Sequence, residues 1–146
     1  MKDIVLDLGL EEYQLSDRNG KVRAVVEFNP TDMYFVERLS NVFERMEGLQ
    51  DKYKGQIEAA KDGVSAFNVA RKIDADMHKI VDDLFGEKGI TEKIYGKMSL
   101  YALGANQVPV WANLLLPIMD EVDGAVKAAQ KESSPKLQEY LNKYNY

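Results

Sequence analysis

Apolar and polar residues alternate over much of the first thirty residues, and this period of two predicts β structure. The apolar positions are Ile4, Leu6, Leu8, Tyr13 and Leu15 in the first run, and Val22, Ala24, Val26 and Phe28 in the second. Asn19-Gly20 separates the runs and favours a tight hairpin turn, because both residues tolerate a positive φ. We therefore expect a β-hairpin of two or three strands within residues 1–29.

After Asn29 the apolar residues recur at steps of three and four, which predicts helices. Thr31 or Asn29 is expected to cap the first helix, which runs to about residue 60. A break near Gly48 or Gly55 is the alternative, since glycine weakens a helix. The apolar stripe of this helix consists of Phe35, Leu39, Val42, Met46, Leu49 and Tyr53.

Glycines divide the next part of the chain. A second helix follows the turn at residues 61–63 and is expected to end at Gly86. Its apolar stripe consists of Phe67, Ala70, Ile73, Met77, Ile80 and Leu84. A short helical piece begins at Thr91 and stops at Gly96, and residues 99–103 are expected to form another.

The clearest amphipathic pattern runs from Asn106 to about Lys131. Its apolar residues are Val108, Trp111, Leu115, Ile118, Val122, Ala125 and Ala129. Pro117 is expected to kink this helix, because proline removes a hydrogen bond of the helix interior. Residues 132–135 read ESSP, a cap followed by a first-turn proline, and predict a separate terminal helix.

The expected fold is α+β and mostly α, with an N-terminal β-hairpin followed by four or five helices, one of them long. A length of 146 residues fits a single domain. We expect it to consist of a β-hairpin at 1–29, a helical core at 30–131 and a C-terminal helical tail at 132–146.

Composition narrows the classes of function. The net charge is −5, and lysines and acids are mixed along the chain without a basic block, which argues against a nucleic-acid-binding protein. The absence of cysteine excludes a disulfide framework and a thiolate zinc site. Because no apolar stretch has the length of a membrane span and no signal peptide opens the chain, we expect a cytoplasmic protein.

The glycines and lysines of LFGEKGITEKIYGK, residues 84–97, suggest a phosphate-binding loop. A P-loop requires G-x-x-x-x-G-K-[ST] after a buried strand. Here Gly96-Lys97 is followed by Met98, and the glycines follow a helix. We therefore interpret them as helix ends, and the lysines as solvated charges.

No other residues indicate a catalytic, cofactor-binding or metal-binding site. Asp74, His78 and Asp82 could share a helix face, but a metal ion would need further ligands, and a solvated helix flank is the simpler interpretation. The neighbouring acids Asp82 and Asp83 point about 100° apart on a helix, so they form no facing dyad and are expected to be solvated.

Aromatic residues leave two interpretations open. Trp111 lies on an apolar stripe and is expected in the core rather than in a ligand site. The terminal residues Tyr140, Leu141, Tyr144 and Tyr146 either dock on the core or contact a partner, because aromatic side chains are enriched at interfaces.

The order of these elements, with two short motifs, resembles that of small tail proteins of siphophages and prophages of Gram-positive bacteria. The first motif is FNPTD at residues 28–32, where a strand passes into a helix, and the second is DDLFGEKGITEKIYG at residues 82–96. The resembling proteins are encoded between the tail-tube and tape-measure proteins and are interpreted as tail assembly chaperones. The kink at Pro117 and the tyrosine-rich end do not match this pattern.

The resemblance implies a bacteriophage protein without enzymatic activity or cofactor. Its expected partners in the bacterial host cytoplasm are the tape-measure protein and the tail-tube protein, together with other copies of itself. Long helices with apolar stripes suit this role, since they can offer a groove to an amphipathic partner. The alternatives are a structural tail or head-completion component retained in the virion, and an enzyme whose site combines scattered acids with His78.

Overall fold

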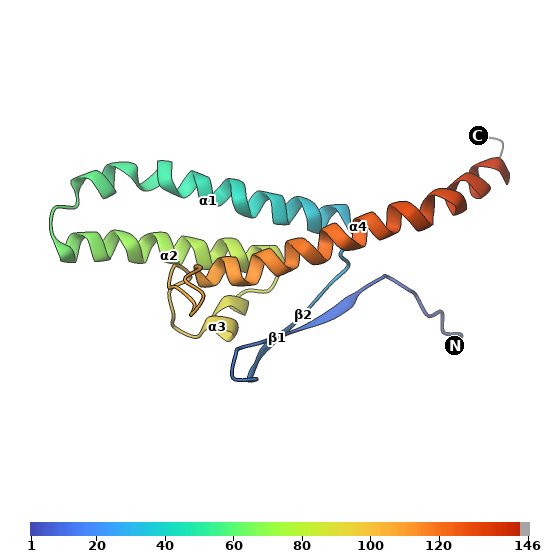
Figure 1. Cartoon of the computed structure of the whole chain (residues 1–146), viewed down its shortest axis with the longest axis horizontal. Helices are drawn as coiled ribbons and strands as arrows, with labels where there is room; N and C mark the ends of the chain where they lie inside the picture. Colours follow the sequence, from blue (N-terminus) through green and yellow to red (C-terminus); the bar gives the residue numbers. More distant parts are fainter. Residues whose placement is uncertain (144–146) are drawn as a thin grey trace.

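The computed structural model describes the backbone of residues 1–143 and the side chains of residues 1–130 and of Glu139. Within this part, a two-stranded antiparallel hairpin precedes four helices, so the predicted α+β, mostly α fold is confirmed. The elements are β1 (Glu11–Ser16), β2 (Val22–Phe28), α1 (Met33–Ala59), α2 (Gly63–Phe85), α3 (Ile90–Tyr95) and α4 (Val110–Lys143). Figure 1 shows α1 and α2 as a long helical hairpin, with α3 and the β-hairpin near its open end.

The turn between β1 and β2 is built around the side chain of Asp17. Its Oδ1 accepts hydrogen bonds from the backbone N–H groups of Asn19, at 2.9 Å, and Lys21, at 3.1 Å. Gly20 has a φ of 81°, whereas Asn19 does not have a positive φ. The predicted hairpin is confirmed, but its turn is longer than a two-residue loop and needs only one left-handed residue.

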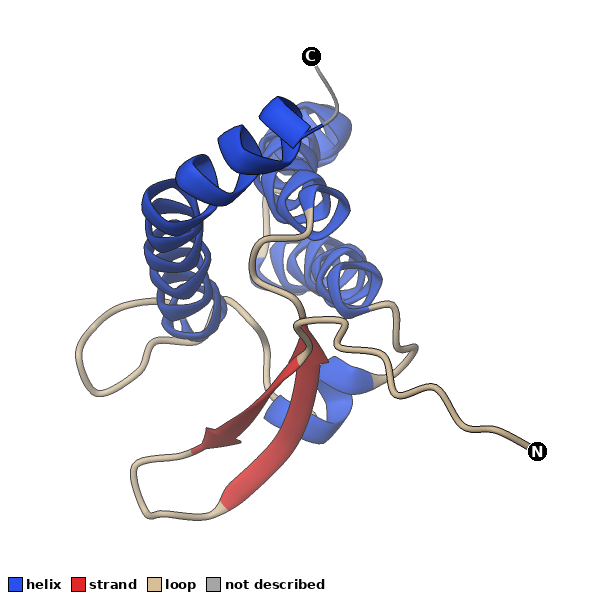
Figure 2. Cartoon of the chain, turned by 90° about the vertical axis from the view of Figure 1, so that its right-hand side faces the viewer, coloured by secondary structure: helices blue, strands red, loops and turns tan. Residues whose placement is uncertain are grey.

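Residues 1–10, here called the N-terminal arm, form no strand, although their alternation predicts one. The arm extends away from the rest of the molecule (Figures 1 and 2). At its root, Gly9 has a φ of 63°, and the Asn29 Nδ2 donates a hydrogen bond to the Leu8 carbonyl at 2.9 Å. This root directs the arm away from the line of β1, so no strand of its own molecule lies beside it.

Helix α1 is unbroken across Gly48 and Gly55. Its N-cap is Asp32, which accepts a hydrogen bond from the Tyr34 N–H at 3.0 Å. Neither Thr31 nor Asn29 caps the helix as predicted, because the Asn29 side chain instead accepts bonds from the N–H and hydroxyl of Thr31, at 2.9 and 2.8 Å.

Helix α2 begins at an Asp62 cap and ends at Gly86, which has a φ of 65°, as predicted for its end. Only the C-terminal half of its expected stripe is buried. The Phe67 side chain is 62% exposed, and Ala70 is also exposed, so their assignment to the core is wrong. Figure 1 gives the reason: the tip of the α1–α2 hairpin projects beyond α4, and no third element among residues 1–143 covers it there.

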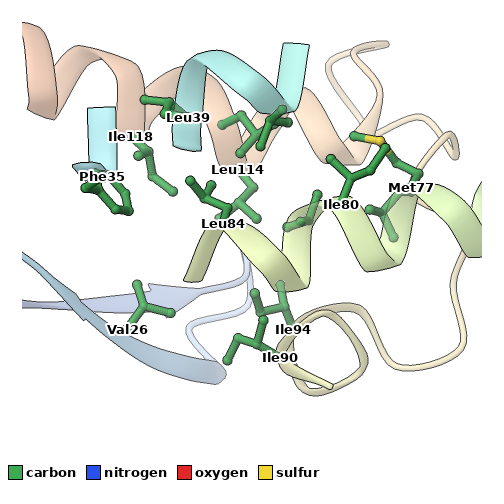
Figure 3. Close-up of a cluster of buried hydrophobic side chains, with 14 of the residues drawn as sticks. Val26, Phe35, Leu39, Met77, Ile80, Leu84, Ile90, Ile94, Leu114 and Ile118 are labelled. Atoms are coloured by element: carbon green, nitrogen blue, oxygen red, sulfur yellow. The ribbon is translucent and has the colours of Figure 1, made fainter. Parts of the chain in front are cut away.

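The core lies where α1, α2, α4 and β2 converge. Figure 3 shows Leu39, Leu84, Leu114 and Ile118 pointing toward one another from three helices. The buried apolar residues are Val26, Phe28, Phe35, Leu39, Val42, Leu49, Tyr53, Met77, Ile80, Val81, Leu84, Ile90, Ile94, Leu100, Leu114, Leu115, Ile118 and Val122. Stacked rings join the sheet to α1, with 4.4 Å between the ring centres of Tyr13 and Phe28 and 4.1 Å between those of Phe28 and Phe35.

Two predictions about the C-terminal half are wrong. Residues 99–103 form turns rather than a helix, and the chain then closes a loop through a bridge between Leu103 and Pro109. Helix α4 continues through residues 132–135 to Lys143, so no separate terminal helix begins there. The good helix formers on both sides of ESSP explain why cap-like letters did not end α4. Figure 2 shows that α4 changes direction toward its C-terminal end.

Candidate functional site

A groove of about 1150 Å³ opens between β1 and the first half of α4, and we call it the β1–α4 groove. Figure 2 shows the two elements that bound it. Its helical wall consists of Val110, Asn113, Leu114, Pro117, Ile118 and Glu121. These positions follow steps of three and four, so they form one face of α4. Ile94, Tyr95 and Met98 line the groove from α3 and the chain that follows it.

The opposite wall is the free edge of β1. Residues 12–18 all line the groove, and they include side chains from both faces of the strand: Tyr13 and Leu15 from one face, Gln14 and Ser16 from the other. Within the described residues, β1 pairs with β2 alone, so the backbone groups of its other edge have no strand partner. Such an edge can bind an extended segment through backbone hydrogen bonds.

The groove carries opposite charges at its two ends. Glu12 and Glu121 lie at the end where β1 begins, and Arg18 lies at the end where β1 turns toward β2. No hydrogen bond or ion pair holds the Arg18 side chain within the described residues. Burial raises the pKa of the Tyr13 phenol, and its 2.7 Å hydrogen bond to Glu11 raises it further. Tyr13 therefore remains a neutral hydrogen-bond donor at physiological pH.

Two long-range hydrogen bonds hold the walls in place. The Arg23 Nε donates to the Ile94 carbonyl at 2.8 Å, which joins β2 to α3. The Tyr95 hydroxyl donates to the Val110 carbonyl at 2.9 Å, which joins α3 to the first turn of α4. Burial raises the pKa of Tyr95, so this donor also stays protonated. The β-hairpin and α4 are thus both attached to α3.

The segment that includes α3 is held by Asp82. The Asp82 carboxylate accepts hydrogen bonds from the Gly89 N–H, at 3.1 Å, and from the N–H and hydroxyl of Thr91, at 2.9 and 2.8 Å. Thr91 is almost completely buried. Gly86 and Gly89 are helix ends, as the sequence predicts, but the expectation that Asp82 is solvated is wrong.

Asp74 and His78 hold the same segment. The His78 Nδ1 lies 2.9 Å from the Thr91 hydroxyl oxygen, and its Nε2 lies 3.3 Å from an Asp74 oxygen. Asp74 also accepts hydrogen bonds from the Ser99 hydroxyl, at 3.0 Å, and the Leu100 N–H, at 2.8 Å. The three side chains do share one face of α2, but they are only partly exposed and bind residues of the neighbouring segment, so the interpretation as a solvated flank is wrong.

The described part of the chain contains no group of three or more histidine, aspartate or glutamate residues arranged to hold a metal ion. None of the helices in that same part is long and apolar enough to cross a membrane.

The prediction of partner contact by the terminal residues concerns side chains that lie outside the described part of the structure, namely those of Tyr140, Leu141, Tyr144 and Tyr146. Trp111 is half-buried at the edge of the core, where its ring lies edge-on to that of Phe43, with 6.5 Å between ring centres. Sequence reasoning missed the β1–α4 groove. The three leucines at residues 114–116 give no signal of it, because Leu116, the exposed one, does not line the groove.

No protein-family model, curated protein or solved structure matches this chain.

Proposed function

We propose that the protein is a non-enzymatic phage tail assembly chaperone of the bacterial host cytoplasm, which binds an apolar segment of the tape-measure protein and assists assembly of the tail-tube protein around it. The observation that carries this proposal is the open β1–α4 groove, with apolar side chains on one wall and an unpaired strand edge on the other. The resemblance at residues 82–96 supports the choice of partner.

The groove suits temporary binding of a segment that would otherwise aggregate. Leu15, Met98 and Pro117 line the groove and offer apolar surface, and burying apolar surface is favourable by roughly 25 cal/mol per Å². The edge of β1 adds backbone hydrogen bonds that do not depend on the partner's side chains. An opening along the molecular surface allows the partner to leave without unfolding of the chaperone. These properties favour a chaperone that accepts varied apolar segments.

Co-purification with the tape-measure protein tests the proposal. We expect the wild type to keep that protein soluble on co-expression, and Pro117→Arg, which places a long charged side chain in the groove, to lose most of this effect. Pro117 is exposed, so the variant should fold. Val64→Arg is the matched control, because Val64 is 72% exposed on α2 and does not line the groove.

An insoluble tape-measure protein in the presence of the wild type would contradict the proposal, as would equal activity of Pro117→Arg. Mass spectrometry of purified virions separates the alternative role. A chaperone is absent or scarce in the particle, whereas stoichiometric amounts would identify a structural tail or head-completion component.

A further inference from the structure

The N-terminal arm and the β1–α4 groove are complementary, yet they do not meet within one molecule. We propose that the arm of one copy binds in the groove of a second copy, where it adds a strand to the free edge of β1, so that copies associate head to tail. This inference concerns the groove of the proposed function but does not require the tape-measure protein.

The arm exposes far more apolar surface than a soluble chain usually presents on one segment. The exposed fractions are 80% for Ile4, 89% for Val5, 70% for Leu6, 59% for Leu8 and 48% for Leu10. Ile4, Leu6 and Leu8 lie at alternate positions, so an extended arm carries them on one face. The arm therefore has the pattern of a strand with one face to be buried, without a sheet to join.

The root of the arm excludes the groove of its own molecule. Besides the Asn29 bond to Leu8, the Asp7 Oδ1 accepts a hydrogen bond from the Gly9 N–H at 3.0 Å. A Cβ on Gly9 would lie 2.7 Å from the Asn29 Nδ2, so side chain and backbone are tightly fitted at this point. Figure 2 shows the arm leaving the molecule on the side opposite to α4. The groove it reaches must belong to a second copy.

The dimensions and faces of arm and groove agree. Strand β1 contains six residues, and the alternating part of the arm, residues 3–8, has the same number. Six residues of strand span roughly 20 Å. An arm paired with β1 would place Ile4, Leu6 and Leu8 beside Tyr13 and Leu15, facing the apolar wall of α4. One bound segment would then form hydrogen bonds with the strand edge on one wall and cover the apolar side chains on the other.

Charge favours the parallel direction of pairing. A parallel arm brings Lys2, together with Asp3, to the groove end that holds Glu12 and Glu121. It brings Asp7 to the end where Arg18 and Arg23 outnumber Asp17. An antiparallel arm would place Asp7 beside the two glutamates. The parallel arrangement also supplies Arg18 with a charged partner, which none of the described residues of its own molecule provides.

The contact joins two different surfaces, so it is heterologous. However many copies are joined, the assembly keeps one free arm at one end and one free groove at the other. Association is consequently open-ended unless the copies close into a ring. A tape-measure segment would compete with the arm for the same groove.

Sedimentation velocity over a range of concentrations tests the proposal. We expect the wild type to associate, and Ile4→Asp/Leu6→Asp to remain monomeric because its arm no longer binds. Pro117→Arg should also remain monomeric, because its groove is blocked. The matched control is Val64→Asp/Phe67→Asp, whose two sites are 72% and 62% exposed at the far end of the molecule. This control should associate like the wild type.

Mixing the two monomeric variants gives the sharpest result. The intact arm of Pro117→Arg should bind the intact groove of Ile4→Asp/Leu6→Asp, and the product should be a one-to-one dimer that cannot grow. A monomeric wild type, an arm or groove variant that associates like the wild type, or a mixture without dimer would each overturn the inference. Arm-dependent association without tape-measure binding would refute the proposed function alone.

Discussion

Asp82 and Asp83 are neighbours in the sequence with different surroundings. Asp82 holds three hydrogen-bond donors of the segment before and within α3, two of them on the buried Thr91. Asp83 points to the surface, where it forms an ion pair with Arg45 at 2.9 Å. The backbone donors that bind Asp82 have no other acceptor within the described residues. At the surface, in contrast, water can take the place of the Asp83 carboxylate.

We therefore expect Asp82→Ala to lower the free energy of unfolding by about 2–3 kcal/mol, because buried donors lose their acceptor. Asp83→Ala should change it by less than about 1 kcal/mol, the usual range for an exposed ion pair. Urea unfolding followed by circular dichroism measures both. Equal losses for the two variants would show that Asp82 does not hold this segment.

The same substitution should have opposite effects at Gly86, which ends a helix, and at Gly48, which lies inside one. At both positions a Cβ would meet no atom within 4 Å, so crowding does not distinguish them. Gly86→Ala should destabilise the protein by about 1–2 kcal/mol, since Gly86 has a φ of 65°. Gly48→Ala should stabilise it by about 1 kcal/mol, because Gly48 lies inside α1. Thermal unfolding of both variants checks the opposite signs.

At the scale of an element, two consecutive residues of α4 lie on different faces of the helix. Leu115 is fully buried, whereas the Leu116 side chain is 48% exposed. Leu115→Asp should unfold the protein, because an unpaired buried charge costs at least about 4 kcal/mol, close to the whole stability of a small domain. Leu116→Asp should leave it folded. Solubility and circular dichroism distinguish them, and a folded Leu115→Asp would mean that the helix phase is wrong.

The sequence predicted these elements where local and tertiary preferences agree. Gly86 and Gly96 ended helices as expected, and Phe35, Leu39 and Leu115 are buried as their spacing indicates. It failed where the outcome depends on the neighbours of an element. Phe67 belongs to a valid helical stripe, but none of the described elements covers that part of α2.

The candidate site was less predictable than the fold. The groove requires that α4 stand apart from β1, and no spacing of apolar residues specifies the gap between two elements. The arm illustrates the same limit. Ile4, Leu6 and Leu8 have the correct period for a strand, but a strand also needs a neighbour, which the sequence pattern does not supply.

At the scale of the whole molecule, one polar cluster ties α1 to α2. Asp76 on α2 accepts hydrogen bonds from the Lys52 ammonium at 2.8 Å and the Tyr53 hydroxyl at 2.6 Å, both from α1. These bonds, that from Lys52 foremost, lower the pKa of Asp76 below its usual value of 3.8. A carboxyl with a lowered pKa stabilises the fold above its unfolded pKa, and this contribution is lost as the pH falls through the folded pKa.

Asp76→Asn should therefore be less stable than the wild type at neutral pH, by no more than about 1 kcal/mol because the ion pair is solvent-accessible. The difference should shrink as the pH falls below about 4, where this carboxyl becomes protonated in the unfolded chain, and it should vanish as the pH falls through the lowered pKa of the folded state. Urea unfolding at a series of pH values measures it. Asp51→Asn, at an exposed acid on α1, serves as the control for the substitution itself. A pH-independent loss in Asp76→Asn would contradict the assignment.

Asn29 joins the root of the arm to the start of α1 through a single side chain, with its Nδ2 on Leu8 and its Oδ1 on Thr31. Every copy of the chain therefore presents its arm at one orientation relative to its own helices. Successive copies joined from arm to groove would be related by the same rotation and the same translation, which defines a screw axis. The apolar residues of the N-terminal arm would supply the affinity, while the side-chain amide of Asn29 would set the handedness and the pitch of the resulting helical assembly.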